Sequence, residues 1–173
     1  MTICGGSLPV AEFFTRSVVC NTGPLLALSR ASLGTLLPKL FPRVLTTTEV
    51  CAELTAKDTG DAAEIRLTLA AIEIISASRP DPLLTTELDA GEASVIQAAR
   101  DLQITGVLID ERRARRIAAE AYGLEVRGTC AVLVQAKRRA LLPKVKPALE
   151  SMVAGGYFIG SQLFAECLKQ AGE

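Results

Sequence analysis

The sequence contains no histidine and no tryptophan, and its aromatic residues are limited to five phenylalanines and two tyrosines. The absence of histidine excludes a Ser–His–Asp triad and a histidine general base, and it removes one of the usual ligands of structural zinc. The five cysteines are widely spaced and form no C-x-x-C pair, so a cysteine-only zinc site is not expected. The few aromatic residues offer little surface for stacking on nucleic-acid bases. Carboxylates and a bound cation therefore remain as the means for hydrolytic chemistry.

Long apolar runs are also missing, because charged residues interrupt every stretch that approaches the length of a membrane span. Residues 1–16 lack the basic start and sustained apolar core of a signal peptide, and we interpret them as a leader of uncertain order. The remaining residues, 17–173, have no internal repeat or low-complexity linker and are predicted to form one domain that includes the C-terminal helices. These features predict a cytoplasmic protein that does not enter a membrane.

The net charge is zero, but the two signs are unevenly distributed. Residues 47–92 contain ten acidic and three basic residues, a net charge of −7. Residues 110–144 contain four acidic and nine basic residues, a net charge of +5. An acidic region and a basic region in one domain are what a site for a cation and a polyanion requires. On charge alone, two solvated faces that balance each other are the simpler interpretation.

Short β-rich stretches alternate with helical patterns along the chain. Strands are predicted at 17–20, 44–46, 72–76, 106–109 and 125–127. Helices are predicted at 25–29, 32–41, from 47 or 48 onward, 62–71, 87–103, 111–122, 129–140, 145–154 and 161–170, with Thr129 as an N-cap and a polar loop at 77–86. This alternation predicts an α/β fold with a mostly parallel sheet covered on both sides.

Two of the predicted strands stop at an oxygen-bearing side chain. Asn21 follows the first strand and Asp110 follows the fourth, while Glu92 lies near the start of a long helix. Open α/β sheets bind ligands in the crevice beyond the carboxyl ends of their strands. Oxygen ligands gathered there suit a hard divalent cation such as Mg²⁺ or Mn²⁺.

Each of these side chains also has a structural interpretation. Asp110 is well placed to cap the helix that begins at Glu111, and Glu92 is an ordinary first-turn acid favoured by the helix dipole. Asn21, in the run Asn-Thr-Gly-Pro, is typical of a residue that bonds its own turn. A cleft position is favoured for Asp110 because it follows a fully apolar strand, and for Glu92 because Gly91 and Ala93 indicate close packing.

A series of sequence blocks in a fixed order covers nearly all of the chain from residue 17 onward. The blocks include NTGPLLAL at 21–28, LGTLLPKLF at 33–41, EVCAEL at 49–54, GEASVIQAA at 91–99, LIDERRAR at 108–115, RGT at 127–129 and AGE at 171–173. In this order and spacing they resemble the PIN domain family, and most closely a prokaryotic PIN-like subgroup of unassigned function.

The resemblance implies a three-layer α/β/α sandwich with an acidic cleft that binds Mg²⁺ or Mn²⁺ and cuts single-stranded RNA. Carried over by motif, the catalytic and metal-binding residues would be Asn21, Glu53, Glu92 and Asp110. Glu49, one helical turn before Glu53, is an alternative on geometry alone. The PIN pattern normally has Asp at the position of Asn21, and an amide oxygen brings no negative charge to a metal. Many relatives are the toxin half of toxin–antitoxin pairs, which implies an antitoxin partner and a homodimer or higher homo-oligomer.

Three further residues are predicted to contact nucleic acid. Arg112 and Arg116 share one face of the helix that follows Asp110, and Thr22 adjoins Asn21. The arginines are equally well explained as partners of the acidic cleft or as solvated residues. The second basic run, 137–139, is interpreted as a solvated helix end.

Two functions remain open at this point. The first is a metal-dependent ribonuclease that uses the four cleft residues, with Asn21 as a neutral ligand or water-positioning group. The second is a PIN-like scaffold that no longer cleaves and acts as a nucleic-acid-binding or regulatory protein-interaction module.

Overall fold

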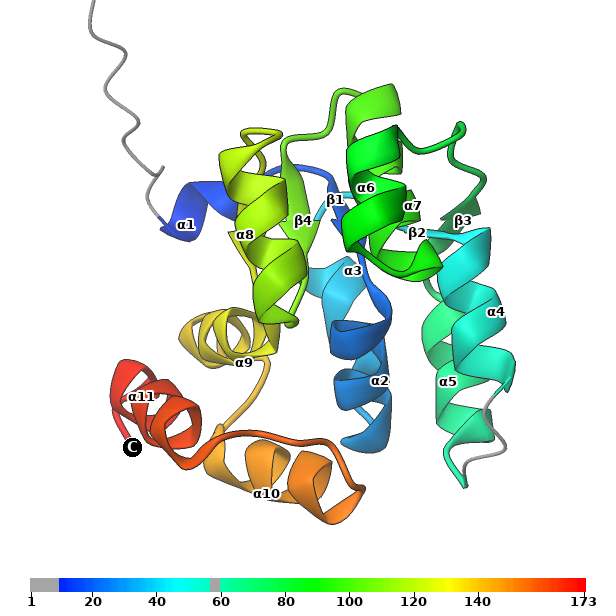
Figure 1. The fold of residues 1–173 in the computed structure, drawn as a ribbon. Coiled ribbons are helices and arrows are strands. Elements are labelled where there is room, and N and C mark those ends of the chain that lie inside the picture. Colours follow the sequence, from blue (N-terminus) through cyan, green and yellow to red (C-terminus); the bar gives the residue numbers. More distant parts are fainter. Residues whose placement is uncertain (1–9, 57–59) are drawn as a thin grey trace, which may run out of the picture.

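A computed structural model of the chain describes residues 10–56 and 60–173 (Figure 1). Five strands form one sheet in the order β3-β2-β1-β4-β5, and every neighbouring pair is parallel. The strands are β1 (Val18–Cys20), β2 (Val44–Thr47), β3 (Glu73–Ile75), β4 (Gly106–Leu108) and β5 (Glu125–Arg127). The predicted strands thus all exist, with boundaries that differ by no more than one residue at each end.

Helices fill the connections between the strands and the C-terminal part of the chain. They are α1 (Val10–Phe13), α2 (Thr22–Arg30), the 3₁₀ turn η1 (Gly34–Leu36), α3 (Leu37–Leu40), α4 (Thr48–Ala56), α5 (Ala62–Ala70), α6 (Pro82–Glu87), α7 (Ala90–Asp101), α8 (Arg112–Glu120), α9 (Thr129–Arg138), α10 (Lys146–Ala154) and α11 (Ser161–Ala171).

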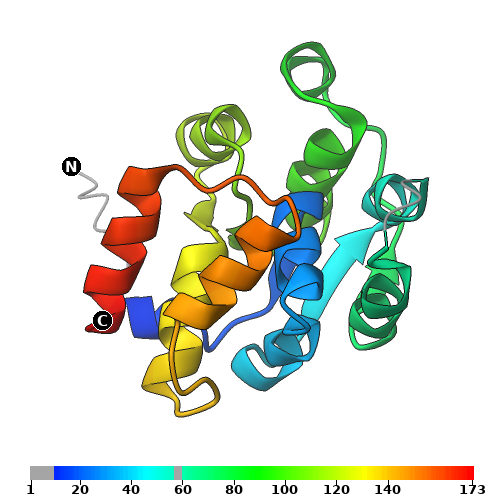
Figure 2. The same ribbon diagram turned by 90° about the horizontal axis from the view of Figure 1, so that it is seen from below.

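The sheet is covered on both faces, which confirms the predicted three-layer α/β/α fold. Helix α7 packs against β1, β2 and β4, and α8 packs against β5. Because the chain reverses its direction across the sheet after β3, right-handed crossovers place α7 and α8 on the face opposite α2 and α3. Helix α9 packs against α2 and α3, and Figure 2 shows α10 and α11 lying beside α2 and α9.

The core is built on the central strands and on α7. All three residues of β1 and of β4 are buried, as expected for parallel strands covered on both faces. Residues 91–99 of α7 are buried as well, so this helix is enclosed on every side. Phe13 and Phe14 pack edge to face, and Phe41 lies 4.8 Å from Phe14 between ring centroids. Burying a side chain of this size contributes roughly 1.5–3 kcal/mol to folding.

Three local predictions are wrong. The segment predicted as a loop at 77–86 contains the start of α6, which has Pro82 at its first position and Asp81 as its N-cap. The single helix predicted at 32–41 is divided into η1 and α3. The N-cap of α9 is Gly128, and Thr129 is the first residue inside the helix.

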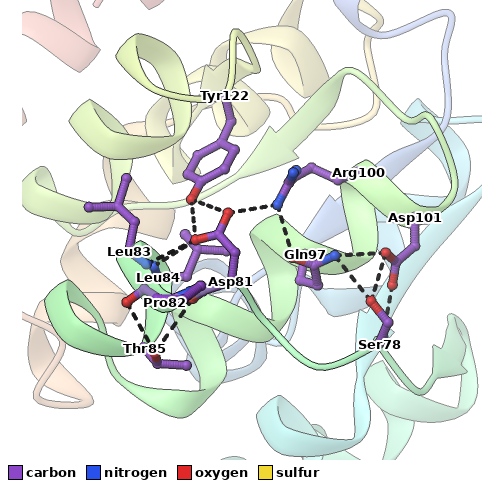
Figure 3. Close-up of polar contacts among 10 residues, drawn as sticks. All are labelled: Ser78, Asp81, Pro82, Leu83, Leu84, Thr85, Gln97, Arg100, Asp101 and Tyr122. Atoms are coloured by element: carbon purple, nitrogen blue, oxygen red, sulfur yellow. Dashed lines mark hydrogen bonds and ion pairs between the residues drawn. The ribbon is translucent and has the colours of Figure 1, made fainter.

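Asp81 is the centre of a polar network that joins α6, α7 and α8 (Figure 3). Its carboxylate accepts hydrogen bonds from the amides of Leu83 and Leu84, from the Tyr122 hydroxyl at 2.6 Å and from the Arg100 guanidinium at 2.8 Å. The Arg100 guanidinium also lies over the Tyr122 ring, 4.8 Å from its centroid. We call these five residues the Asp81 network. The bonds continue through Gln97 to Asp101 and Ser78 (Figure 3).

Glu173, which follows α11, connects α9 to the start of α10. The Glu173 carboxylate accepts hydrogen bonds from the Lys137 ammonium at 2.7 Å and from the amides of Val145 and Lys146 at the start of α10. These donors lower the pKa of Glu173 to about 2, with the lysine as the largest cause. Within residues 10–56 and 60–173, none of the helices has the length and apolar character needed to cross a bilayer.

Candidate functional site

The candidate site lies at the carboxyl edge of the sheet, beside β1 and β4. These two strands are neighbours in space although they are far apart in the chain, which makes their junction the topological switch point of the sheet. Asn21 follows β1 directly, and its backbone amide donates to the carbonyl of Leu108 at 2.9 Å. Asp110 follows β4 after one intervening residue. The fold therefore brings Asn21 and Asp110 to the same edge, as the strand pattern predicted.

Asp110 is held by three hydrogen-bond donors. The backbone N–H of Thr129 donates to Oδ1 at 2.8 Å, and the Thr129 hydroxyl donates to Oδ2 at 2.6 Å. The Tyr157 hydroxyl also donates to Oδ2, at 2.5 Å. Glu111, not Asp110, caps α8 through its bond from the Ala114 amide. The structural interpretation of Asp110 as the cap of α8 is therefore wrong, and Asp110 instead holds the first turn of α9.

Glu53 projects from the second turn of α4 toward the start of α2 and α7. Its Oε2 accepts a hydrogen bond of 2.5 Å from the Thr22 hydroxyl, and its Oε1 accepts one of 3.1 Å from the Gly91 amide. Glu49, the alternative on the same helix, accepts from the hydroxyl of the adjacent Thr48. The geometry thus favours Glu53 as the member of α4 that reaches the site. Thr22, one of the three predicted nucleic-acid contacts, uses its hydroxyl to bond Glu53.

Glycines allow the backbone to approach both carboxylates. A Cβ on Gly128 would lie 2.5 Å from Oδ1 of Asp110, and a Cβ on Gly91 would lie 2.5 Å from Oε1 of Glu53. Both distances are shorter than any stable contact, so no other residue fits without displacing the carboxylate. A Cβ on Gly23 would meet Asp110 at 3.5 Å, an ordinary contact distance. Gly91 and Gly128 therefore shape the site as much as the acids do.

Glu92 carries the most perturbed carboxyl group of the site. It lies in the first turn of α7, where the Asp89 side chain caps the helix by accepting from the Glu92 amide at 2.8 Å. Burial is the largest cause that raises its pKa to about 7, and the nearby negative charges of Asp89, Glu111 and Glu53 raise it further. Negative charge therefore accumulates around Glu92 beyond what the helix dipole and the backbone offset.

Asn21 has a buried oxygen with no partner. The residue is 5% exposed, and its Oδ1 accepts no hydrogen bond from any residue that the structure describes. Although Asn21 occupies the N-cap position of α2, it makes no side-chain bond to the helix. The predicted turn-forming bond of Asn21 is therefore absent. A buried acceptor without a donor is costly, and at such a position it indicates a missing water or ion.

These residues fit a hydrated divalent cation rather than a fully enclosed one. Within the described ranges no three Asp, Glu, Cys or His side chains converge on one point. Mg²⁺, however, normally keeps several waters and uses only one or two carboxylates of the protein. Such a cation would be a partner for the unbonded oxygen of Asn21, and its charge would offset the negative charges around Glu92. We conclude that the residues present fit Mg²⁺ or Mn²⁺.

The four arginines of α8 differ in what they contact. Arg113 pairs with Glu87, and Arg115 donates to the carbonyl of Ile109 at 2.7 Å. Arg112 and Arg116 are exposed and have no ion-pair partner in the described part of the chain. Arg112 and Arg116 are the two arginines predicted to contact nucleic acid, and that role stays a prediction.

Sequence reasoning missed Tyr157, Gly128 and the role of Thr129. Thr129 was predicted only as a helix start. Asp110 follows β4 and Gly128-Thr129 follows the neighbouring strand β5, so a contact between them is expected from a parallel sheet. Tyr157 lies in the segment between α10 and α11, and nothing in the sequence around it indicates that it returns to Asp110.

Comparison with protein-family models matches residues 17–173 to a family described as PIN domain. Comparisons with curated proteins and with solved structures found no match.

Proposed function

Because the chain belongs to the PIN domain family, a nuclease-type fold whose members generally use divalent metals, we propose that it is a metal-dependent ribonuclease acting on single-stranded RNA. The observation that carries this proposal is the buried, unpartnered Oδ1 of Asn21, which follows β1 at the switch point of the sheet, where open α/β folds bind their ligands. The acidic group around Glu92 is connected to this position through Glu53, which accepts hydrogen bonds from Thr22, next to Asn21, and from Gly91, next to Glu92.

The proposed roles follow from the contacts of each residue. Asp110, through its less occupied Oδ1, and Glu92 would hold Mg²⁺ or Mn²⁺, and the Asn21 oxygen would serve as a neutral third ligand. Glu53 would act from further back, because both of its oxygens already accept hydrogen bonds from the protein. When bound, the metal supplies an acidified water and stabilises charge on the scissile phosphate.

Affinity for RNA would come from phosphate contacts. Arg112 and Arg116 are exposed residues of α8, the helix that follows Asp110, and a guanidinium matches the geometry of a phosphate. Thr22 supports the site indirectly, by orienting Glu53 through its hydroxyl. Recognition that depends on phosphates weakens steeply with salt.

The test is cleavage of single-stranded RNA by the purified chain in Mn²⁺, with and without chelator, and in the Asp110→Asn variant. The proposal expects cleavage that disappears in both conditions. Cleavage that survives chelator and the substitution would show that the activity comes from elsewhere.

A second function is favoured by a specific observation: Asn21 brings no charge, and both oxygens of Glu53 are satisfied by the protein itself. On this alternative the chain is a PIN scaffold that binds nucleic acid or a protein without cleaving. Calorimetric titration with Mn²⁺ separates the two functions. Absence of binding at millimolar Mn²⁺, restored in Asn21→Asp, would favour the scaffold.

We also propose that the chain works with partners, as a toxin controlled by an antitoxin and as a homodimer or higher homo-oligomer. A small DNA-binding protein encoded immediately beside it would support the first part. Light scattering of the purified chain measures the second.

A further inference from the structure

Tyr157 reaches the candidate site from the segment between α10 and α11. Its hydroxyl donates to Oδ2 of Asp110 at 2.5 Å, and a Cβ on Gly23 would lie 3.6 Å from the same hydroxyl. The Tyr157 hydroxyl, the carboxylate of Asp110 and the backbone of Gly23 at the start of α2 therefore meet at one point. Tyr157 lies outside all of the sequence blocks that resemble the PIN domain family.

The backbone holds Tyr157 in this position. Helix α10 ends in a Schellman motif, in which the Tyr157 amide donates to the carbonyl of Met152 at 2.9 Å and the Gly156 amide donates to Val153. Gly156 has a φ of +83°, which the motif requires and which a glycine adopts without strain. Tyr157 is thus the first residue after a fixed helix end and not part of a freely moving loop.

The three donors to Asp110 are divided unequally between its oxygens. A carboxylate has about four lone-pair directions, two on each oxygen. Thr129 and Tyr157 occupy both directions of Oδ2 with their hydroxyls, whereas Oδ1 accepts only the Thr129 amide. The backbone of Gly128 approaches Oδ1 closely, and a Cβ there would lie 2.5 Å from Oδ1 and 3.0 Å from Nη1 of Arg115. By this count of donors, one lone pair of Asp110, on Oδ1, accepts no hydrogen bond.

We propose that Tyr157 is a positioning residue that closes Oδ2 of Asp110 and so presents Oδ1 to a divalent cation. This assignment rests on the proposed metal-dependent function. Carboxylates that bind metals are themselves oriented by hydrogen bonds, and loss of such an outer partner typically costs about 10- to 100-fold in metal affinity. Tyr157 would be that partner, supplied by the C-terminal layer.

The first experiment measures Mn²⁺ affinity by calorimetry in the wild-type chain, in Tyr157→Phe and in Tyr122→Phe. Phenylalanine keeps the ring and removes only the hydroxyl. Tyr122 is a matched control, because its hydroxyl also bonds an aspartate, Asp81, outside the site. The expected result is a Kd raised about 10- to 100-fold in Tyr157→Phe and unchanged in Tyr122→Phe. An unchanged Kd in Tyr157→Phe overturns the proposal, and a lower Kd does so as well, because it shows that the hydroxyl competes with the cation.

The second experiment needs no metal. Urea unfolding in the presence of chelator is measured for the wild-type chain, Tyr157→Phe, Asp110→Ala and the double variant. Because both single changes break one shared hydrogen bond, the double variant should lose less stability than the two single losses together. Additive losses overturn the contact and the proposal with it. A wild-type chain that binds no Mn²⁺ overturns the proposed function instead, and the unfolding cycle distinguishes that result from a wrong assignment of Tyr157.

Discussion

Two aspartates in this protein each accept a hydrogen bond from a tyrosine hydroxyl, and the networks around them have opposite character. Asp81 is bonded by Tyr122, by two backbone amides and by the cationic Arg100 (Figure 3). Asp110 is bonded by Tyr157 and Thr129, and in the part of the chain that the structure describes no lysine or arginine forms an ion pair with it. The donors of Asp81 include a cation, whereas the donors of Asp110 are all uncharged.

The pKa values of Asp81 and of Glu92, another proposed metal ligand, are shifted in opposite directions. The Tyr122 hydroxyl, followed by the amides of Leu84 and Leu83 and by Arg100, lowers the pKa of Asp81 below its ordinary value. Burial and the neighbouring acids Asp89, Glu111 and Glu53 raise the pKa of Glu92 to about 7. A network that balances its own charge stabilises the fold and needs nothing else. On the proposed function, a cation bound by Asp110 and Glu92 would supply the positive charge that the donors of Asp110 lack.

The largest expected effect is on catalysis. Asp110→Asn should reduce Mn²⁺-dependent RNA cleavage on the order of 100-fold or more, because it removes the charge that the unbalanced network offers to a metal. Asp81→Asn should lower stability and leave the cleavage rate per folded molecule unchanged. Cleavage rates and thermal unfolding of both variants test this contrast. Equal losses of activity would show that the two networks do not differ in function.

The second effect concerns the glycine beside Asp110. Gly128→Ala places a Cβ 2.5 Å from Oδ1, so the carboxylate must move, at a cost of about 1–3 kcal/mol in the free energy of unfolding. Gly60→Ala is the matched control, because Gly60 is exposed and a Cβ there meets nothing within 4 Å. Urea unfolding and Mn²⁺ calorimetry should both be altered in the first variant only. A Gly128→Ala chain with unchanged metal affinity would contradict the role given to Oδ1.

The third effect is a pH dependence of stability. The pKa of Glu92 is about 7 in the folded chain and 4.5 as the ordinary value, so folding favours the protonated form. Its ionisation therefore costs nothing below about pH 4.5, and the cost grows as the pH rises to about 7 and is then constant. Glu92→Gln removes the charge and should stabilise the metal-free chain at pH 8 by about 1–2 kcal/mol, allowing for solvent screening, with little effect near pH 4.5.

Urea unfolding with chelator at pH 5 and pH 8 measures this dependence. Glu120→Gln, an exposed acid at the end of α8, is the control and should change stability equally little at both values. A gain of Glu92→Gln that is the same at pH 5 and pH 8 would refute the charge crowding at Glu92.

The smallest effect is on RNA affinity. Arg112→Gln should weaken binding of single-stranded RNA by about three- to tenfold and reduce the slope of log K against log salt by about 0.7, the value for one phosphate contact. Arg113→Gln is the control, because the Arg113 guanidinium already pairs with Glu87. Filter binding in chelator, over a range of salt, measures both. Identical slopes for the two variants would remove Arg112 from the RNA site.

Local sequence patterns predicted most of the fold because each pattern favoured one kind of secondary structure. The apolar run at β4 and the regular helical spacing of α8 have one simple interpretation each, and the structure contains both. The helix α6 was missed because Arg79, Pro80 and Pro82 suggest a loop, although Asp81 followed by Pro82 is a strong helix start. The sequence therefore contained a helix start, but Pro80 and Pro82 favoured the interpretation as a loop.

The residues of the site that follow strands could be predicted from the sequence, whereas the contact from the segment between α10 and α11 could not. Asn21 and Asp110 each follow a strand, so their meeting at one edge follows from a parallel sheet. The distinct states of Glu53 and Glu92, one fully hydrogen-bonded and one with a raised pKa, depend on which backbone amides lie nearby. Tyr157 depends on how α10 packs beside α2, a tertiary contact that no local pattern encodes.

The pairing of β1 with β4 also determines when the site can exist. Val18 pairs with Gly106, so the whole of residues 19–105 must be made before β1 gains its second neighbour. Proteins are synthesised from the N-terminus at about 5–20 residues per second, and during that interval one edge of β1 is open. Asp110 is added just after the partner strand, and Tyr157 arrives later still. A fragment that ends before residue 157 therefore lacks one of the donors that hold Asp110.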